Sequence, residues 1–190
     1  MKANRLFMTV IFSLIGVFAV AQPWMMRPQG PANEFSAMEG TSVLNYNLQM
    51  ERDIHSRAGY GPAFYIFPDS KLDNNQALEL AGKLDLVNII KEYGGRIMVV
   101  NPSSDKWQEQ DLENFRRLIG MGGSPTNVKV IGIGSGATFV NRHLAAADLT
   151  GVIAGIVSID GEPGKICKLP VPAFIGGKNA TKTAKPYQST

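Results

Sequence analysis

Five short, almost entirely apolar runs constrain the fold of this chain more than any other feature of its sequence. They lie at residues 63–67, 97–100, 128–133, 152–159 and 171–175. Such runs, rich in β-branched and aromatic residues, are typical of strands buried on both faces of a sheet. The first four alternate with segments of helical period, an order that produces parallel strands with right-handed crossovers. The sequence therefore predicts an α/β fold: a three-layer sandwich, with helices on both faces of a mostly parallel sheet.

Three segments between these runs have the apolar spacing of amphipathic helices. Asn74 or Asn75 is the expected N-cap of the first helix, and Asp105 with Gln108 is the expected cap pair of the second. The third helix follows the glycines of residues 132–136 directly. The residues expected to face the sheet are Ala77, Leu80, Leu84, Val87 and Ile90 in the first helix, Leu112, Phe115 and Leu118 in the second, and Val140, Leu144 and Ala147 in the third.

The N-terminus has the pattern of a secretory signal peptide. Lys2 and Arg5 precede an apolar run at residues 6–20, which ends in the small-x-small sequence of a cleavage site after Ala21. The run is shorter than the roughly 20 residues that a membrane-spanning helix needs. We therefore expect a secreted or periplasmic protein with no stable membrane insertion after cleavage.

The remaining chain divides into three parts. Residues 22–40 combine proline and glycine without a regular period, which predicts an irregular lead-in. Residues 41–177 form the expected α/β domain, which opens with a half-exposed strand at residues 44–50. Residues 178–190 form a basic polar tail.

Composition excludes several classes of function. The formal charge of +3 includes Lys2 and Arg5, which lie in the predicted signal peptide. The mature chain is therefore close to neutral, and its charge does not support nucleic-acid binding. The single cysteine, Cys167, cannot form an internal disulfide, and we interpret it as a half-buried small apolar residue. The two histidines, His55 and His143, have no second ligand at metal-binding spacing. We predict no metal and no cofactor.

The glycine-rich turn at residues 132–136 has three interpretations. Gly132-x-Gly134-x-x-Ala137 fits the spacing of a dinucleotide fingerprint, but it lies in the third strand-helix unit of an exported chain. The turn also fits a nucleophile elbow, in which small residues flank a serine between strand and helix. In the third interpretation Gly132, Gly134 and Gly136 only allow the helix to pack closely on the sheet.

A wider resemblance favours the elbow. The motifs that carry it are residues 63–67 (AFYIF), 90–94 (IKEYG), 99–102 (VVNP), 124–132 (SPTNVKVIG) and 170–175 (PVPAFI). They resemble the secreted esterases of the polyhydroxybutyrate-depolymerase and feruloyl-esterase type, which are α/β-hydrolases. The resemblance runs from about Pro62 to Gly177 and implies an ester-hydrolase fold, with the family's G-x-S-x-G turn at residues 132–136.

Several positions depart from the family pattern. With Gly132 as the first glycine, Gly134 stands at the nucleophile position; a register shifted by one makes Ser135 the nucleophile but puts Ile133 where a small residue is required. Residues 68–70 (PDS) replace the family's His-Gly at the oxyanion loop, leaving Ser70 as a candidate. The residues after the last strand, 176–179, contain no carboxylate.

The rest of the triad is also missing. Asp160 is a weak candidate for a displaced acid, and no histidine follows His143, which we expect to point away from the elbow. The chain ends one strand and one helix early for this family.

Three hypotheses follow. The first is a catalytically incomplete esterase-like domain that binds an ester or carbohydrate ligand. The second is an active serine esterase that uses Ser135 or is completed by further C-terminal sequence. The third is a partner-binding module that uses the lead-in and the basic tail.

Overall fold

The computed structural model describes residues 33–38, 41–46, 62–93, 96–121 and 128–188. The predicted signal peptide, most of the lead-in and His55 lie outside the described residues.

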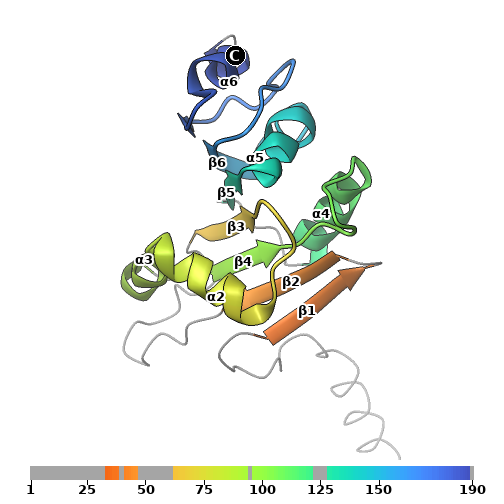
Figure 1. The fold of residues 1–190 in the computed structure, drawn as a ribbon, viewed down its shortest axis with the longest axis vertical. Helices are drawn as coiled ribbons and strands as arrows, with labels where there is room; N and C mark the ends of the chain where they lie inside the picture. Colours follow the sequence, from red (N-terminus) through yellow and green to blue (C-terminus); the bar gives the residue numbers. More distant parts are fainter. Residues whose placement is uncertain (1–32, 39–40, 47–61, 94–95, 122–127, 189–190) are drawn as a thin grey trace, which may run out of the picture. The chain divides into compact units, whose positions relative to one another are not determined.

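The described chain is built on one seven-stranded sheet (Figure 1). The order of strands is β1-β2-β4-β3-β5-β6-β7, in which β4, β3, β5, β6 and β7 are parallel and the β1–β2 and β2–β4 pairs are antiparallel. This confirms the predicted α/β class with a mostly parallel sheet. The strands are β1 (Asn33–Met38), β2 (Thr41–Tyr46), β3 (Ala63–Phe67), β4 (Arg96–Val100), β5 (Val128–Ile133), β6 (Ile153–Ile159) and β7 (Ala173–Gly176).

Strand β1 lies in the segment that the sequence predicts to be irregular. It pairs with β2, and the register between them shifts between Ser36 and Met38. A short strand with an irregular register lacks the clean alternation of apolar and polar residues that identifies strands from sequence. β2 begins three residues before the predicted strand at 44–50, of which residues 47–50 lie outside the described residues.

The first predicted helix is two helices, α2 (Asn74–Lys83) and α3 (Leu86–Tyr93). Asp85 separates them with a φ of 56°, a left-handed conformation that no helix interior accommodates. The N-cap of α2 is Asp73 rather than Asn74 or Asn75. Its side chain accepts a hydrogen bond from Gln76 N–H at 2.9 Å, and the Gln76 side chain accepts one from Asp73 N–H in return.

The second predicted helix begins five residues later than its expected cap. It is α4 (Gln110–Met121), and the buried side chain of Asp111, in its first turn, bonds back to the loop before the helix. The two oxygens of Asp111 accept hydrogen bonds from Ser103 N–H at 3.0 Å and from Gln108 N–H at 2.8 Å. The loop 103–108 is thereby held against the start of α4.

The third predicted helix is α5 (Ser135–Phe139) continued by the π-helical turn η1 (Val140–Leu144). In this turn Ala145 N–H donates to the Val140 carbonyl oxygen at 2.8 Å, one residue further back than in an α-helix. Asn141 lies within the turn and is buried.

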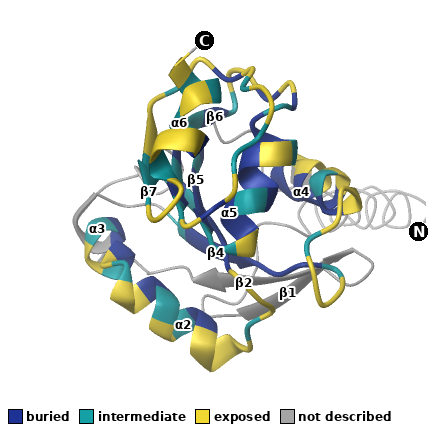
Figure 2. Ribbon diagram, turned by 45° about the horizontal axis from the view of Figure 1, so that its top comes forward, coloured by how far each residue is buried: buried dark blue, intermediate teal, exposed yellow. Residues whose placement is uncertain are grey.

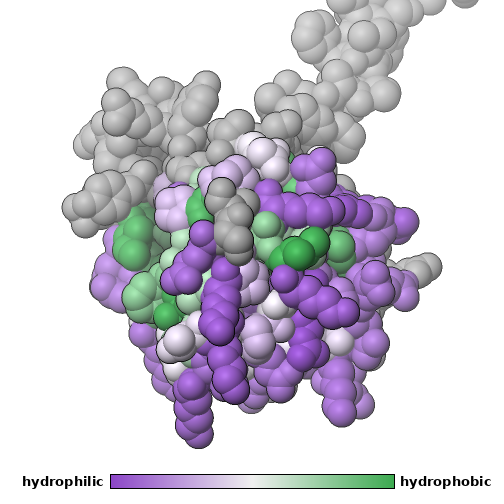
Figure 3. All heavy atoms as spheres, turned by 90° about the horizontal axis from the view of Figure 1, so that it is seen from above, coloured by the Kyte–Doolittle hydropathy of each residue, from purple (hydrophilic) through white to green (hydrophobic). Residues whose placement is uncertain are grey.

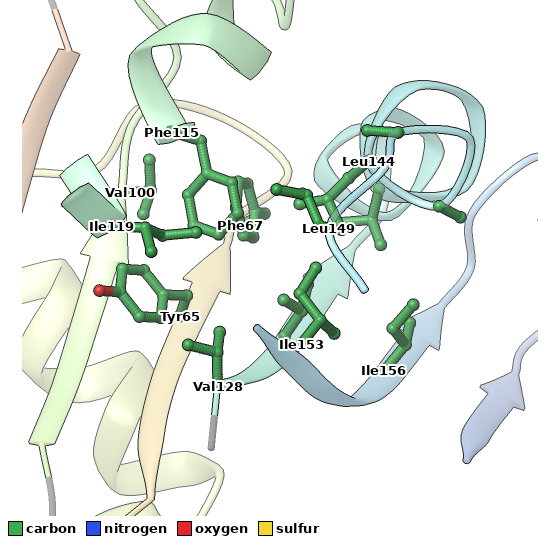
Figure 4. Close-up of a cluster of buried hydrophobic side chains, with 14 of the residues drawn as sticks. Tyr65, Phe67, Val100, Phe115, Ile119, Val128, Leu144, Leu149, Ile153 and Ile156 are labelled. Atoms are coloured by element: carbon green, nitrogen blue, oxygen red, sulfur yellow. The ribbon is translucent and has the colours of Figure 1, made fainter. Parts of the chain in front are cut away.

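Two hydrophobic clusters cover the two faces of the sheet, because alternate strand residues point to opposite sides. Tyr65 and Phe67 point into the larger cluster, beneath α4, α5 and η1, and Ile66 points into the smaller one, beneath α2 and α3. Figure 2 shows the buried residues of these helices turned toward the strands. In the larger cluster Phe67 packs edge-on against Phe115, with ring centroids 5.1 Å apart (Figure 4).

A further helix, α6 (Ala180–Gln188), occupies most of the segment predicted as a basic tail. Two of its side chains bond to the rest of the domain. Thr183 Oγ1 donates to the Gly161 carbonyl oxygen at 3.0 Å, and Tyr187 OH donates to Asn141 Oδ1 at 2.9 Å. Burial raises the pKa of Tyr187 above its usual value, so the phenol remains a hydrogen-bond donor throughout the neutral range.

Candidate active site elbow

The turn between β5 and α5 has the geometry of a sharp strand-to-helix elbow. β5 ends at Ile133, Gly134 follows with φ 57° and ψ −119°, and Ser135 begins α5. A residue with a side chain adopts such a φ only at a cost in backbone strain. The strained position of the elbow is therefore Gly134, and Ser135 is already helical.

The two neighbouring glycines allow the helix to approach the strands. A Cβ on Gly132 would lie 2.6 Å from the Cα of Ala137, and a Cβ on Gly136 would lie 2.5 Å from the Pro68 carbonyl oxygen. Either contact is shorter than any that packed atoms tolerate. Gly132 and Gly136 thus have a steric role, as the third interpretation of the turn requires.

Asp69 closes the elbow from the loop after β3. Its Oδ1 accepts a hydrogen bond from Ser135 N–H at 2.6 Å, and its carbonyl oxygen accepts one from the Ser135 hydroxyl. Its side chain also lies against Gly134, where a Cβ would come within 2.6 Å of Asp69 Cγ. No sequence motif gives Asp69 a role of its own. Its place two residues after the end of β3, which pairs with β5, is the signal that could have identified it.

The loop that carries Asp69 is held on both sides. Trp107 Nε1 donates to the Pro68 carbonyl oxygen at 2.9 Å. Asn101, at the end of β4, accepts from Leu72 N–H at 3.0 Å and donates to the Leu72 carbonyl oxygen at 2.8 Å. The backbone on either side of Asp69 is therefore held by half-buried Trp107 and buried Asn101.

The predicted serines occupy different places. Ser135 is exposed at the start of α5, and its hydroxyl donates to a backbone carbonyl, with no histidine or carboxylate side chain accepting from it among the described residues. Ser70 is exposed on the loop after β3, beside Asp69. In the described structure, Asp69 rather than Ser70 contacts the elbow.

Asp160 lies at the end of β6 with a φ of 56°. Its Oδ1 accepts a hydrogen bond from Lys178 N–H at 3.1 Å, so the carboxylate faces the turn after β7. It does not line the cavity over the elbow.

The sequence predicts that His143 points away from the position of a triad base, and the structure places it in the wall of the cavity. His143 follows Ser135 by eight residues, which at the rise of an α-helix is about 12 Å along the helix axis. Both residues nevertheless line one open cavity. The imidazole stacks on Phe139, with ring centroids 5.5 Å apart. It is thus part of the wall of the site, too far from Ser135 to serve as its base.

The cavity over the elbow has a volume of about 670 Å³. Trp107, Phe139 and His143 form a stacked aromatic wall, in which the Trp107 and Phe139 centroids lie 4.9 Å apart. Charged side chains surround it, among them an ion pair between Arg142 and Glu162. The lining residues are Asp69, Asp105, Lys106, Trp107, Ser135, Thr138, Phe139, Arg142, His143 and Glu162.

Two features are absent from the described residues. No group of three or more histidine, cysteine or carboxylate side chains lies close enough together to bind a metal ion. None of the described helices has the length and hydropathy required to cross a membrane.

No protein-family model matches this chain, and no curated protein matches it in sequence. Solved structures do match it. An α/β hydrolase enzyme from a Medee basin deep-sea metagenome library superimposes with a TM-score of 0.53 at 17% sequence identity, over 75% of this chain and 63% of that one. A thermostable esterase superimposes with a TM-score of 0.55 at 10% identity, over 83% of this chain and 49% of that one.

These likenesses show the fold. The described chain has an α/β-hydrolase-like fold, as the sequence resemblance implies, and it spans less than two thirds of the length of either of these enzymes.

Proposed function

We propose that this chain, whose fold is that of α/β hydrolases, is an exported domain that binds a ligand over the elbow without hydrolysing it. The observation that carries this proposal is the pair Gly134 and Asp69. The strained position of the elbow, where the fold places a nucleophile, has no side chain, and the Asp69 carboxylate lies in the space that one would need.

The oxyanion site is compromised by the same carboxylate. In this fold the backbone N–H after the nucleophile stabilises the negative oxygen of the tetrahedral intermediate. That N–H belongs here to Ser135 and donates to Asp69 Oδ1. The Asp69 carboxylate would repel the negative oxygen of the intermediate. The elbow is therefore poorly suited to acyl transfer, even with the Ser135 hydroxyl as the nucleophile.

The cavity nevertheless retains features of a binding site. An aromatic wall beside hydroxyl, carboxylate and guanidinium groups suits a ligand with both a flat apolar face and several polar groups. We infer an ester or a carbohydrate as the ligand class, in agreement with the family resemblance. Export rests on the sequence pattern of residues 1–21.

A covalent probe tests the absence of catalysis. The mature chain is exposed to a fluorophosphonate beside an active serine esterase, and its intact mass is measured. We expect no adduct on the folded chain, because no side chain of the described residues is placed to act as a base for Ser135. An adduct that disappears in Ser135→Ala would instead establish the active serine esterase.

Ligand binding is tested separately, by calorimetric titration with soluble oligosaccharides and with a non-hydrolysed ester analogue. We expect saturable binding that Trp107→Ala weakens and that Phe174→Ala, a change at an exposed aromatic ring outside the cavity, leaves unchanged. Binding that is insensitive to Trp107→Ala, or no binding by the folded chain, contradicts the proposal. Mass spectrometry of the exported protein checks the expected cleavage after Ala21.

A further inference from the structure

A second cavity adjoins the cavity over the elbow. Its volume is about 720 Å³, and Arg142 and His143 line both cavities. The remaining lining residues, Ala146, Pro163, Lys165 and Ile166, do not line the elbow cavity. The floor is the next turn of the helix that starts at the elbow, and the wall is the loop after β6.

The wall of this cavity exposes an unusual amount of apolar surface. Ile166 is 52% exposed, and among the residues whose side chains the structure describes the other exposed large hydrophobic residue is Phe174, at 66%. Figure 3, which views the molecule from above, shows small hydrophobic patches surrounded by long hydrophilic side chains. An exposed apolar side chain that lines a concave site together with Pro163 and Ala146 is a feature of ligand-binding surfaces.

The charge of the cavity is positive. Arg142 is paired with Glu162, whereas Lys165 has no ion pair within the described part of the chain. No carboxylate lines this cavity, in contrast to the elbow cavity, which Asp69, Asp105 and Glu162 line. An apolar surface beside an uncompensated ammonium group is complementary to an apolar molecule that carries a negative charge.

The wall is held in place before any ligand binds. Glu162 N–H donates to Thr138 Oγ1 at 3.0 Å, and Asn141 Nδ2 donates to the Glu162 carbonyl oxygen at 2.8 Å. On the far side of Ile166, Lys168 N–H donates to the Ala145 carbonyl oxygen at 2.8 Å. The loop is therefore anchored to the helix at both ends, which reduces the entropy lost on binding.

We propose that this second cavity binds a small organic anion with an apolar body, its carboxylate or sulfonate group beside Lys165 and Arg142 and its hydrocarbon on Ile166. The site goes beyond the function proposed above and does not depend on it, because Lys165 and Ile166 do not contribute to the elbow cavity. A neutral saccharide would neither pair with the charge of Lys165 nor bury the apolar side chain of Ile166.

The experiment measures the fluorescence of anilinonaphthalene sulfonate with the mature chain, and then its displacement by decanoate. We expect Ile166→Ser to raise the dissociation constant about tenfold, the effect of losing one buried aliphatic side chain. We expect Lys165→Gln to raise it about threefold, as for one exposed charge. Matched controls are Phe174→Ser and Lys182→Gln, which change an exposed apolar residue and an exposed lysine elsewhere and are expected to have no effect.

Decanol provides the second comparison, because it has the same hydrocarbon chain and no charge. Weaker displacement by decanol than by decanoate supports the site. Equal displacement by both, loss of binding in Phe174→Ser rather than Ile166→Ser, or no saturable binding overturns it. Circular dichroism of each variant establishes that it is folded, and Ile166→Val, which keeps the apolar surface, is expected to bind like the original chain.

Discussion

The side chain of Asp69 fills the space beside Gly134 that any larger residue at position 134 would occupy. A Cβ on Gly134 would lie 2.6 Å from Asp69 Cγ and 2.9 Å from Asp69 Cβ, and the backbone there has a φ of 57°. Two independent effects therefore oppose a serine at the elbow: a steric clash and a backbone conformation that favours glycine.

We predict that Gly134→Ser destabilises the chain by about 1 to 3 kcal/mol and creates no esterase activity. Chemical denaturation measures the loss. Gly151→Ser is the matched control for the backbone effect alone, because Gly151 also has a positive φ, 82°, but no atom lies within 4 Å of its would-be Cβ. Equal losses in the two variants would show that Asp69 does not restrict position 134.

The clash predicts an energetic coupling between the two positions. In a double-mutant cycle, Gly134→Ser together with Asp69→Gly should cost less free energy of unfolding than the sum of the single changes. Additivity within about 0.3 kcal/mol would contradict the clash.

Asp69 also acts as an acceptor at the start of α5. Asp69→Ala removes the acceptor of Ser135 N–H, and we expect a loss of about 0.5 to 2 kcal/mol, as for an N-cap residue. Asp105→Ala changes another exposed carboxylate that lines the same cavity, and we expect it to alter stability little. Thermal unfolding of both variants at neutral pH distinguishes them.

Tyr187 predicts a loss of stability at alkaline pH. Burial raises the pKa of Tyr187 in the folded chain above the value of about 10 of an unfolded tyrosine. The folded state therefore holds the phenol proton more tightly, so this contribution is complete below pH about 10 and is lost as the pH rises above it.

Two tyrosine variants distinguish the loss of stability at alkaline pH from the contribution of the Tyr187 hydrogen bond at neutral pH. Tyr187→Phe should reduce the alkaline loss, but it should cost about 0.5 to 1.5 kcal/mol at neutral pH because buried Asn141 loses a donor. Burial also raises the pKa of Tyr65, whose hydroxyl has no hydrogen-bond partner among the described residues. Tyr65→Phe should therefore reduce the alkaline loss without the cost at neutral pH. Unfolding in urea from pH 8 upward tests both.

Phe67 is the centre of the aromatic cluster behind the elbow. Its ring is fully buried and lies within 6 Å, centroid to centroid, of the rings of Phe115, Trp107 and Phe139. We expect Phe67→Ala to cost about 3 to 5 kcal/mol. Phe174→Ala, at an exposed ring, should change the free energy of unfolding by less than about 0.5 kcal/mol.

The parallel strands and the location of the elbow follow from the sequence, because apolar runs and a glycine cluster reflect forces that act locally. Residues 63–67 and 128–133 are strands at the predicted bounds. The details depend on contacts between distant segments. Asp111 rather than Asp105 holds the loop before α4, through hydrogen bonds from Ser103 and Gln108. Thr183 and Tyr187 tie α6 to residues about 20 and 46 positions away. The contact between Asp69 and Gly134 likewise cannot be predicted from the sequence around either residue.

The contact between Asp69 and Gly134 also bears on how such an elbow changes over evolutionary time. Replacement of the glycine alone yields a less stable chain, because Asp69 still fills the space. Replacement of Asp69 alone removes a helix cap and restores no reactive group. A lineage that regained a serine would have to pass through one of these inferior intermediates, and a histidine base would still be required. The two residues together form a mutational barrier against a serine at position 134.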